Sequence, residues 1–181
     1  VLDVAVNGNG WFVVSPDSGG EQRFYTREGI FYVDNVGNLV NSNGFFVLDS
    51  GGAAINLGEE GIATLNITKG GVITGVNLNG DTIEGDGSVL GLAMFPNQDG
   101  LERVGQNMYQ VSPTSGEPID EYGTPNEGGY GAIASGFLEM SNVDLTDEFT
   151  GMITTQRGYQ ANARTVTTSD HLLEELLNIK R

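Results

Sequence analysis

The sequence predicts a mainly β protein, with a compact antiparallel β body over residues 1–141 and a long C-terminal α-helix of coiled-coil type over residues 142–181. Three observations carry this prediction. The first part of the chain is a series of short apolar segments separated by turn residues. That part has no helical periodicity, which favours an antiparallel sandwich-like or barrel-like body. After residue 141 proline is absent, and apolar residues recur with a helical period.

The strands expected in the first 50 residues differ in how many of their faces are apolar. Residues 2–7 alternate apolar and small or polar side chains, which is the period of a half-buried strand. Residues 11–14 (WFVV) are apolar on both faces and should lie deep in the body. Further strands are expected at 24–26, 30–33, 39–40 and 45–48. Asn43-Gly44 stands between the last two, and this pair is a strong hairpin signal because both residues tolerate positive φ.

Strand-like segments continue to residue 111. Residues 62–67 and 72–78 flank Lys69-Gly70-Gly71, and Asn79-Gly80 predicts a second hairpin with residues 82–84. Residues 89–95 are expected to form a central strand with Leu90, Leu92 and Met94 on one face. Residues 112–131 are rich in Gly, Pro and acidic residues, so we expect a long loop that is exposed, mobile or engaged by a neighbour.

The C-terminal segment carries a heptad a/d seam over more than four heptads. Asp144 is the expected N-cap, and Asp147 and Glu148 suit the positive end of the helix dipole. The seam is formed by residues at alternating steps of four and three: Leu145, Phe149, Met152, Gln156, Tyr159, Ala163, Val166, Asp170, Leu173 and Leu177.

This helix is intrinsically weak. Gly151 and Gly158 each cost about 1 kcal/mol relative to alanine in a helix interior, and many threonines lower its propensity further. Packing must therefore supply most of its stability. The seam either packs on its own domain or serves assembly, and its length favours assembly. Gln156 and Asp170 are polar seam residues of the kind that set register at a cost in stability.

Composition excludes several classes of function. The net charge is −16, and residues 1–141 carry 18 acidic against 4 basic side chains. This field disfavours partners such as nucleic acid and anionic membranes. The chain has no cysteine, which excludes a disulfide scaffold and a thiol enzyme. No apolar run reaches the length of a membrane span, and no signal peptide is visible.

Candidate catalytic and metal-binding residues form no supporting pattern. Asp81, Glu84 and Asp86 match no calcium loop and are interpreted as solvated turn carboxylates. His171 has neither a cysteine nor a second histidine to complete a zinc site, so it is interpreted as a polar helix-face residue. We therefore predict no enzyme, no cofactor, no metal site and no catalytic residue.

Four stretches, in order along the chain, resemble the flagellar axial proteins, the family of rod and hook subunits. Residues 2–12 are similar to the family's LDxAIxGxGFF segment, with Trp11 in place of Phe. Residues 95–118 and 136–181 are similar to its FxNxxGLxxxGxNxY segment and to its C-terminal helix. The most specific stretch matches the pattern YTRxGxFxxDxxGxLV through Tyr25, Thr26, Arg27, Gly29, Phe31, Asp34 and Gly37.

The resemblance implies export through the flagellar secretion channel, and polymerisation with other copies of itself into a hollow, bendable extracellular tube that transmits motor torque. It also implies terminal helices that line the tube, and distal rod, hook cap and hook–filament junction proteins as neighbours. The family's N-terminal helix is not seen here, so the sequence is interpreted as a fragment. The runs at 144–149 and 176–181 are more similar to hook than to rod subunits, which makes a hook subunit the main prediction and a distal rod subunit the alternative.

Two further hypotheses come from other classes. A secreted β-rich binding module would bind a ligand through the 112–131 loop or the acidic turn and would not need the helix. A hydrolase would use paired carboxylates such as Asp34 with Asp49 or Glu59, but no spacing supports that pair.

Overall fold

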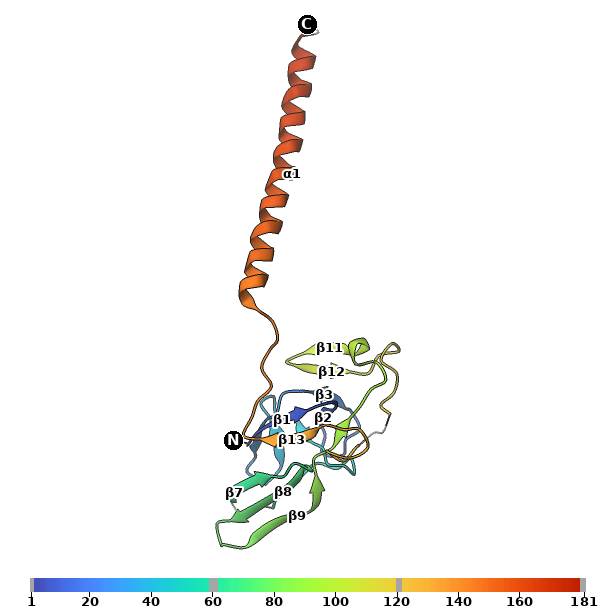
Figure 1. Ribbon diagram of the computed structural model, residues 1–181, viewed down its shortest axis with the longest axis vertical. Helices are drawn as coiled ribbons and strands as arrows, with labels where there is room; N and C mark the ends of the chain where they lie inside the picture. The colour runs from blue at the N-terminus through green and yellow to red at the C-terminus, as the bar shows by residue number, and fades with distance from the viewer. Residues whose placement is uncertain (1, 59–61, 120–121, 180–181) are drawn as a thin grey trace. The chain divides into compact units, whose positions relative to one another are not determined.

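A computed structural model describes residues 2–58, 62–119 and 122–179 of the chain. The chain divides into two units, Val1–Glu139 with the strands and Met140–Arg181 with the helix, and each is described on its own (Figure 1). The described elements are β1 (Leu2–Asn7), β2 (Trp11–Ser15), β3 (Phe24–Thr26), β4 (Ile30–Val33), β5 (Leu39–Asn41), β6 (Phe46–Val47), β7 (Ile62–Ile67), β8 (Val72–Asn77), β9 (Thr82–Val89), β10 (Leu92–Ala93), the 3-10 helix η1 (Gln98–Gly100), β11 (Glu102–Gly105), β12 (Met108–Gln110), β13 (Ala132–Ser135) and α1 (Leu145–Ile179).

The strands form two antiparallel sheets, as predicted from the short strands and tight turns. Among the described residues, the larger sheet has ten strands: nine in the order β11-β12-β3-β2-β6-β5-β4-β1-β13, and β10, which pairs with β2. The smaller sheet has the order β7-β8-β9. The first and last strands of the body are neighbours, because β1 pairs with β13 over Val4↔Ser135 to Asn7↔Ala132.

The central strand β2 is buried on both faces, which confirms the prediction made from its apolar sequence. Phe12 and Val14 lie in one apolar cluster and Val13 lies in another on the opposite face. The Phe12 ring meets Phe31 edge to face at 5.2 Å between centroids, and Tyr25 meets Phe95 at 4.7 Å in the second cluster. Burial of each such side chain contributes about 1.5–3 kcal/mol.

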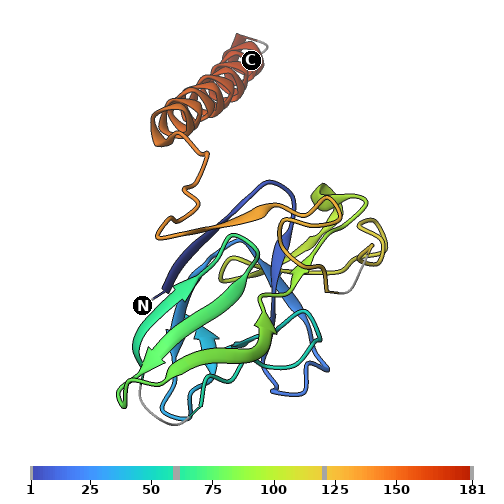
Figure 2. The same cartoon turned by 60° about the horizontal axis from the view of Figure 1, so that its bottom comes forward.

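The smaller sheet covers the first of these clusters. Ile67 of β7 and Ile73 of β8 are buried together with Val4, Phe12 and Leu39 of the larger sheet. Figure 2 shows the three-stranded sheet, in green, in front of the blue strands of the larger sheet. Two sheets that share one core make the body sandwich-like, as the sequence indicated.

One turn design recurs through the body. At Asp34 the side-chain Oδ1 accepts hydrogen bonds from the N–H groups of Val36 and Asn38, both at 2.8 Å. The Asp34 N–H donates to the Asn38 carbonyl at 2.9 Å, and Gly37 lies between them at φ +89°. The side chain thereby holds a tight turn whose last position needs a left-handed residue.

The same arrangement, a polar residue followed three positions later by glycine with positive φ, closes four other turns. They begin at Asn41, Asp49, Thr68 and Asn77, with Gly44, Gly52, Gly71 and Gly80 in the left-handed position. The hairpins predicted at Asn43-Gly44 and Asn79-Gly80 are confirmed: they join β5 to β6 and β8 to β9.

The segment predicted as one strand over 89–95 is divided. β9 ends at Val89 and β10 contains two residues, because the chain passes from the smaller sheet to the larger one at Gly91. The Gly91 N–H donates to the Leu48 carbonyl, and a Cβ on Gly91 would lie 2.5 Å from the Asp49 carbonyl oxygen. The predicted sidedness holds, since Leu90 and Leu92 lie in one cluster and Met94 packs against it.

The described part of the 112–131 loop has no strand, as expected, but it is not free of the body. The Ile119 N–H donates to the Met94 carbonyl, and Gly123 and Leu92 exchange two backbone hydrogen bonds. Ser115 and Tyr130 are buried. A long loop satisfies its backbone polar groups on neighbouring strands when it packs against them, which composition does not reveal.

Candidate assembly surfaces

The helix α1 begins close to the predicted position and continues to Ile179, the last described residue. The Asp144 carboxylate accepts a 2.8 Å hydrogen bond from the Thr146 N–H, which confirms Asp144 as the N-cap. The same backbone hydrogen bond lowers the pKa of Asp144 because it favours the ionised form. Asp147 and Glu148 lie in the first turn. The helix runs for 35 residues without a break.

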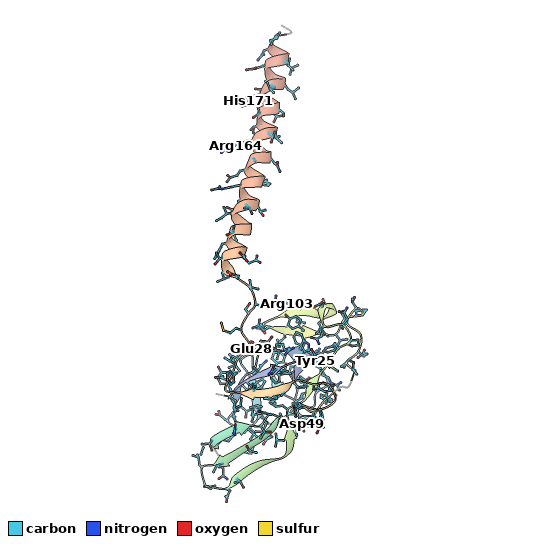
Figure 3. All side chains as sticks on the ribbon, viewed as in Figure 1. Tyr25, Glu28, Asp49, Arg103, Arg164 and His171 are labelled. Atoms are coloured by element: carbon cyan, nitrogen blue, oxygen red, sulfur yellow. The ribbon has the colours of Figure 1, made fainter. Side chains whose placement is uncertain are left out.

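All the seam residues lie on this helix and all are exposed. The large apolar and aromatic members are between 54% (Met152) and 78% (Tyr159) exposed. Figure 3 shows the side chains of α1, Arg164 and His171 among them, projecting outward around the helix. Apolar side chains arranged in one stripe on a single helix need a second surface to be buried. The structure therefore leaves the coiled-coil role of the seam as a prediction.

The heptad pattern did not identify several apolar residues at the end of α1. Leu172, Leu176 and Ile179 are 57–81% exposed and lie off the seam, next to the seam residues Leu173 and Leu177. The last two turns are consequently apolar around more of their circumference than the rest of the helix. The signal was present as two Leu-Leu pairs in the sequence, which a single stripe does not require.

His171 remains a surface residue of the helix. Its Nδ1 lies 3.8 Å from Oε2 of Glu174, one turn away, and both side chains are more than three-quarters exposed. The nearby Ser169 hydroxyl donates to the Thr165 carbonyl. This geometry is that of exposed helix-surface contacts, which are weak.

In the body, the motif residues Tyr25 and Thr26 connect three strands. Tyr25 is buried and Thr26 pairs with both Phe12 of β2 and Met108 of β12. The Thr26 hydroxyl donates to the Asn107 carbonyl at 2.9 Å and accepts from the Glu28 N–H at 3.0 Å. Asn107 has φ +57°, so a side-chain contact supports a turn in the left-handed region.

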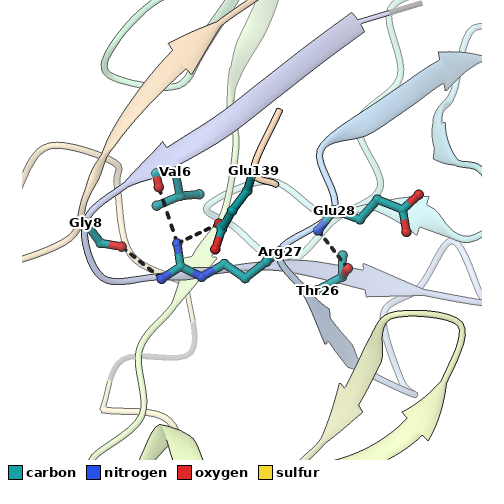
Figure 4. Close-up of polar contacts among 6 residues, drawn as sticks. All are labelled: Val6, Gly8, Thr26, Arg27, Glu28 and Glu139. Carbon is teal, nitrogen blue, oxygen red and sulfur yellow. Dashed lines mark hydrogen bonds and ion pairs between the residues drawn. The ribbon is translucent and has the colours of Figure 1, made fainter. Parts of the chain in front are cut away.

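Arg27 and Gly29 hold the backbone around β1. The Arg27 guanidinium donates to the carbonyls of Val6 and Gly8 and pairs with Glu139 (Figure 4). The Gly29 carbonyl accepts from the Val4 N–H at 2.9 Å, and a Cβ on Gly29 would lie 1.8 Å from the Val4 carbonyl oxygen. Glycine is therefore required sterically at this position.

The last motif residues, Phe31, Asp34 and Gly37, lie in β4 and in the turn that joins it to β5. Phe31 is fully buried against Phe12. The hydrogen bond from the Asn38 side chain to Asp34, followed by backbone N–H donors, lowers the pKa of Asp34 despite the opposing effect of partial burial. A Cβ on Gly37 would lie 2.1 Å from the Gly58 carbonyl oxygen. The motif thus builds the body through core packing and through contacts with the backbone, and any contact it makes with neighbouring subunits stays a prediction.

No catalytic constellation is formed by the candidate residues that the structure describes. Asp34 and Asp49 each cap their own turn, and Glu59 lies outside the described residues. The side chains of Glu84 and Asp86 are also outside the described part. Within residues 2–58, 62–119 and 122–179, no three His, Cys, Asp or Glu side chains are arranged to hold a metal ion. The described helix is not apolar over a stretch long enough for a bilayer.

The body does have an open cleft of about 640 Å³ between β1, β4 and β7. Its walls include Leu2, Tyr32, Asp34, Ile62 and Leu65. Among the described lining residues Asp34 is the one carboxylate, and the adjacent turn already uses it. The cleft has a mixed polar and apolar lining, and its described residues form no arrangement for acid–base chemistry.

Comparison with known proteins assigns two parts of the chain to the same family. The "Flagellar hook protein FlgE/F/G D1 domain" model matches residues 5–75, and the "Flagellar basal body rod FlgEFG protein C-terminal" model matches residues 134–179. The two matches cover the body hairpins just described and the helix with its seam. The chain belongs to the flagellar rod and hook protein family, which confirms the resemblance found in its motifs.

Individual relatives divide between the two kinds of subunit. The flagellar basal-body rod protein of Bacillus subtilis is 44% identical over 99% of this chain and 66% of its own length. That of Buchnera aphidicola from Schizaphis graminum is 38% identical over 96% of the chain and 63% of its own length. The flagellar hook protein of Treponema pallidum is 48% identical over 66% of the chain and 25% of its own length. The chain thus spans about two thirds of the length of these rod relatives and a quarter of this hook relative.

Proposed function

We propose that this chain is the structural part of a distal flagellar rod subunit, which assembles with other copies of itself through the α1 seam. The observation that carries the proposal is the extent of the similarity. The rod relatives described above align over 96–99% of the chain, whereas the hook proteins of Treponema pallidum and Borreliella burgdorferi align over 66% and 82% of it. The order of preference is therefore the reverse of that predicted from the ends of the helix.

A structural role also agrees with the chemistry of the described residues. The motif residues pack in the core or hold turns and neighbouring backbone, and α1 carries an exposed apolar stripe. Such a stripe is suited to helix–helix contact along a polymer. A torque-bearing subunit needs interfaces of this kind rather than a reactive pocket.

The hook remains the second candidate, because the Treponema pallidum hook protein has the higher percentage identity over the part it shares. Either subunit would be exported and would then polymerise in the flagellum, with other axial proteins as neighbours. They would differ in the shape of the polymer, which is a straight drive shaft for a rod and a bendable universal joint for a hook.

A chimera tests the proposal directly. This chain would replace the matching two thirds of the Bacillus subtilis rod protein in a strain that lacks its own copy, and basal bodies would be isolated for electron microscopy. We expect straight rods of normal length and restored swimming. Export of the chimera without rods would overturn the rod proposal, and curved hooks from the matching hook-protein chimera would then support the second candidate. Failure of both chimeras would leave the binding-module hypothesis, with saturable sugar or Ca²⁺ binding as its test.

A further inference from the structure

The chain leaves the body through an exit segment, residues 136–144, between β13 and α1. Gly136 has φ +79°, and its N–H donates to the Asp3 carbonyl at 2.7 Å, so the chain turns away from β1 here. After this turn Phe137, Leu138 and Met140 are 68%, 44% and 88% exposed. Apolar burial therefore does little to hold the exit segment against the body.

Beyond Gly136, one ion pair among the described residues holds this segment against the body. Nη1 of Arg27 lies 3.5 Å from Oε2 of Glu139, which is the single acidic residue between positions 128 and 143 (Figure 4). Arg27 follows β3, more than a hundred positions earlier in the sequence. The contact therefore connects the end of the body to its first hairpins.

The guanidinium of Arg27 is fixed independently of Glu139. Nη1 donates to the Val6 carbonyl at 3.4 Å and Nη2 donates to the Gly8 carbonyl at 2.9 Å. The guanidinium carbon also lies 5.5 Å from the centre of the Trp11 ring. A planar fork held by two carbonyls and an aromatic face is preorganised, so less side-chain entropy is lost when a carboxylate binds it.

We propose that Arg27 is a positioning residue that fastens Glu139, so that the free linker to the helix begins at Met140 rather than at Phe137. Release of Glu139 would free residues 137–139 and extend the reach of the linker by up to about 10 Å, at 3.3–3.6 Å per residue. The Glu139 side chain is 47% exposed, so salt weakens the pair. The inference concerns the chain itself and does not rest on the proposed function.

The proposal is tested by measuring at which residue after β13 the backbone becomes mobile. Backbone ¹⁵N relaxation gives an order parameter for each amide, about 0.85 in a rigid backbone and below 0.6 in a flexible one. For the unmodified chain at low salt we expect body-like values through Glu139 and a fall at Met140. In Glu139→Gln, or in the unmodified chain at 0.5 M NaCl, we expect the fall to begin at Phe137.

A second variant separates positioning from general stability. Arg27→Lys keeps the positive charge but loses the planar guanidinium, so the fall in order parameter should begin at Phe137. The same substitution should shift the indole N–H resonance of Trp11, the single tryptophan. Glu139→Gln should leave that resonance in place. The control Glu127→Gln, at an exposed acid of the preceding loop, should change neither. A fall at the same residue in the unmodified chain and both variants would overturn the inference, as would a uniform loss of order throughout the body.

Discussion

At the scale of single residues, Gly29 lies where the chain before β4 is in backbone contact with β1. Its carbonyl accepts a hydrogen bond from the Val4 N–H. An added Cβ would lie 1.8 Å from the Val4 carbonyl oxygen, which is a steric overlap. Gly29→Ala must therefore push β1 and β4 apart next to the buried Phe31. We expect a loss of about 3 kcal/mol in the free energy of unfolding, at the upper end of overpacking effects, measured by urea denaturation.

Gly70 provides the matched control for that prediction. It lies in the turn between β7 and β8, and no atom lies within 4 Å of its would-be Cβ. Gly70→Ala should change the unfolding free energy by less than about 0.5 kcal/mol, as surface substitutions do. Equal effects of the two substitutions would show that the contact at Gly29 relaxes without cost.

Asp34 gives the body a defined dependence on pH. Its pKa is lowered in the folded protein, chiefly by the Asn38 side-chain hydrogen bond. The ionised carboxylate therefore stabilises the fold above the ordinary Asp pKa of about 3.9, and this contribution is lost as pH falls through the lower folded pKa. In Asp34→Asn we expect a smaller loss of stability between pH 5 and pH 2.5, measured as the difference in unfolding free energy from the unmodified chain.

Asn38→Ala should also weaken this pH dependence, since it removes the largest contribution to the shift while keeping the carboxylate. If the unmodified chain and Asp34→Asn lost stability in parallel over that range, the turn carboxylate would not be coupled to folding.

At the scale of elements, the sequence was most informative where geometry is local. The Asn43-Gly44 and Asn79-Gly80 hairpins need a residue that tolerates positive φ at Gly44 and Gly80, and the Asp144 cap needs a short side chain that accepts a hydrogen bond from the first turn. The division of 89–95 into β9 and β10 was not predictable. It depends on the Gly91 contact with Leu48 and Asp49, about forty positions away. The attachment of the 112–131 loop is equally non-local.

The two glycines of α1 test whether the helix is adapted to neighbours rather than to its own stability. No side chain lies within 4 Å of a Cβ built on Gly151 or Gly158. Each substitution to alanine should therefore stabilise an isolated helix by about 1 kcal/mol. We expect Gly158→Ala to retain more helical signal than the unmodified chain as the temperature rises, measured by circular dichroism at 222 nm.

The same variant in the Bacillus subtilis chimera separates two reasons for the glycine. Normal rod assembly would mean that the glycine has no role at an interface. Impaired assembly together with a more stable helix would mean that a neighbouring backbone approaches closely there. An unchanged helical signal would contradict the propensity argument itself.

At the scale of the whole molecule, the sequence predicts more about the body than about what covers the helix. The body closes its own core, and its motif residues carry a family signature whose steric role is visible only in the fold. The helix was located together with its seam, but the surface that covers the seam stays a prediction. Periodicity specifies which side chains need covering, but the dependence of association on this seam stays a prediction.

Gln156 is the seam position where that dependence can be measured. A polar residue at an a or d position favours the one register in which it is satisfied, at a cost in stability. In Gln156→Leu each buried leucine would add about 1.5–3 kcal/mol, so association should strengthen at least about tenfold while the number of oligomeric species rises. Sedimentation velocity over a range of concentrations measures both. Thr154→Leu is the control, because a residue two positions away lies on nearly the opposite side of the helix. Unchanged species in Gln156→Leu, or the same change in Thr154→Leu, would mean that this seam does not direct association.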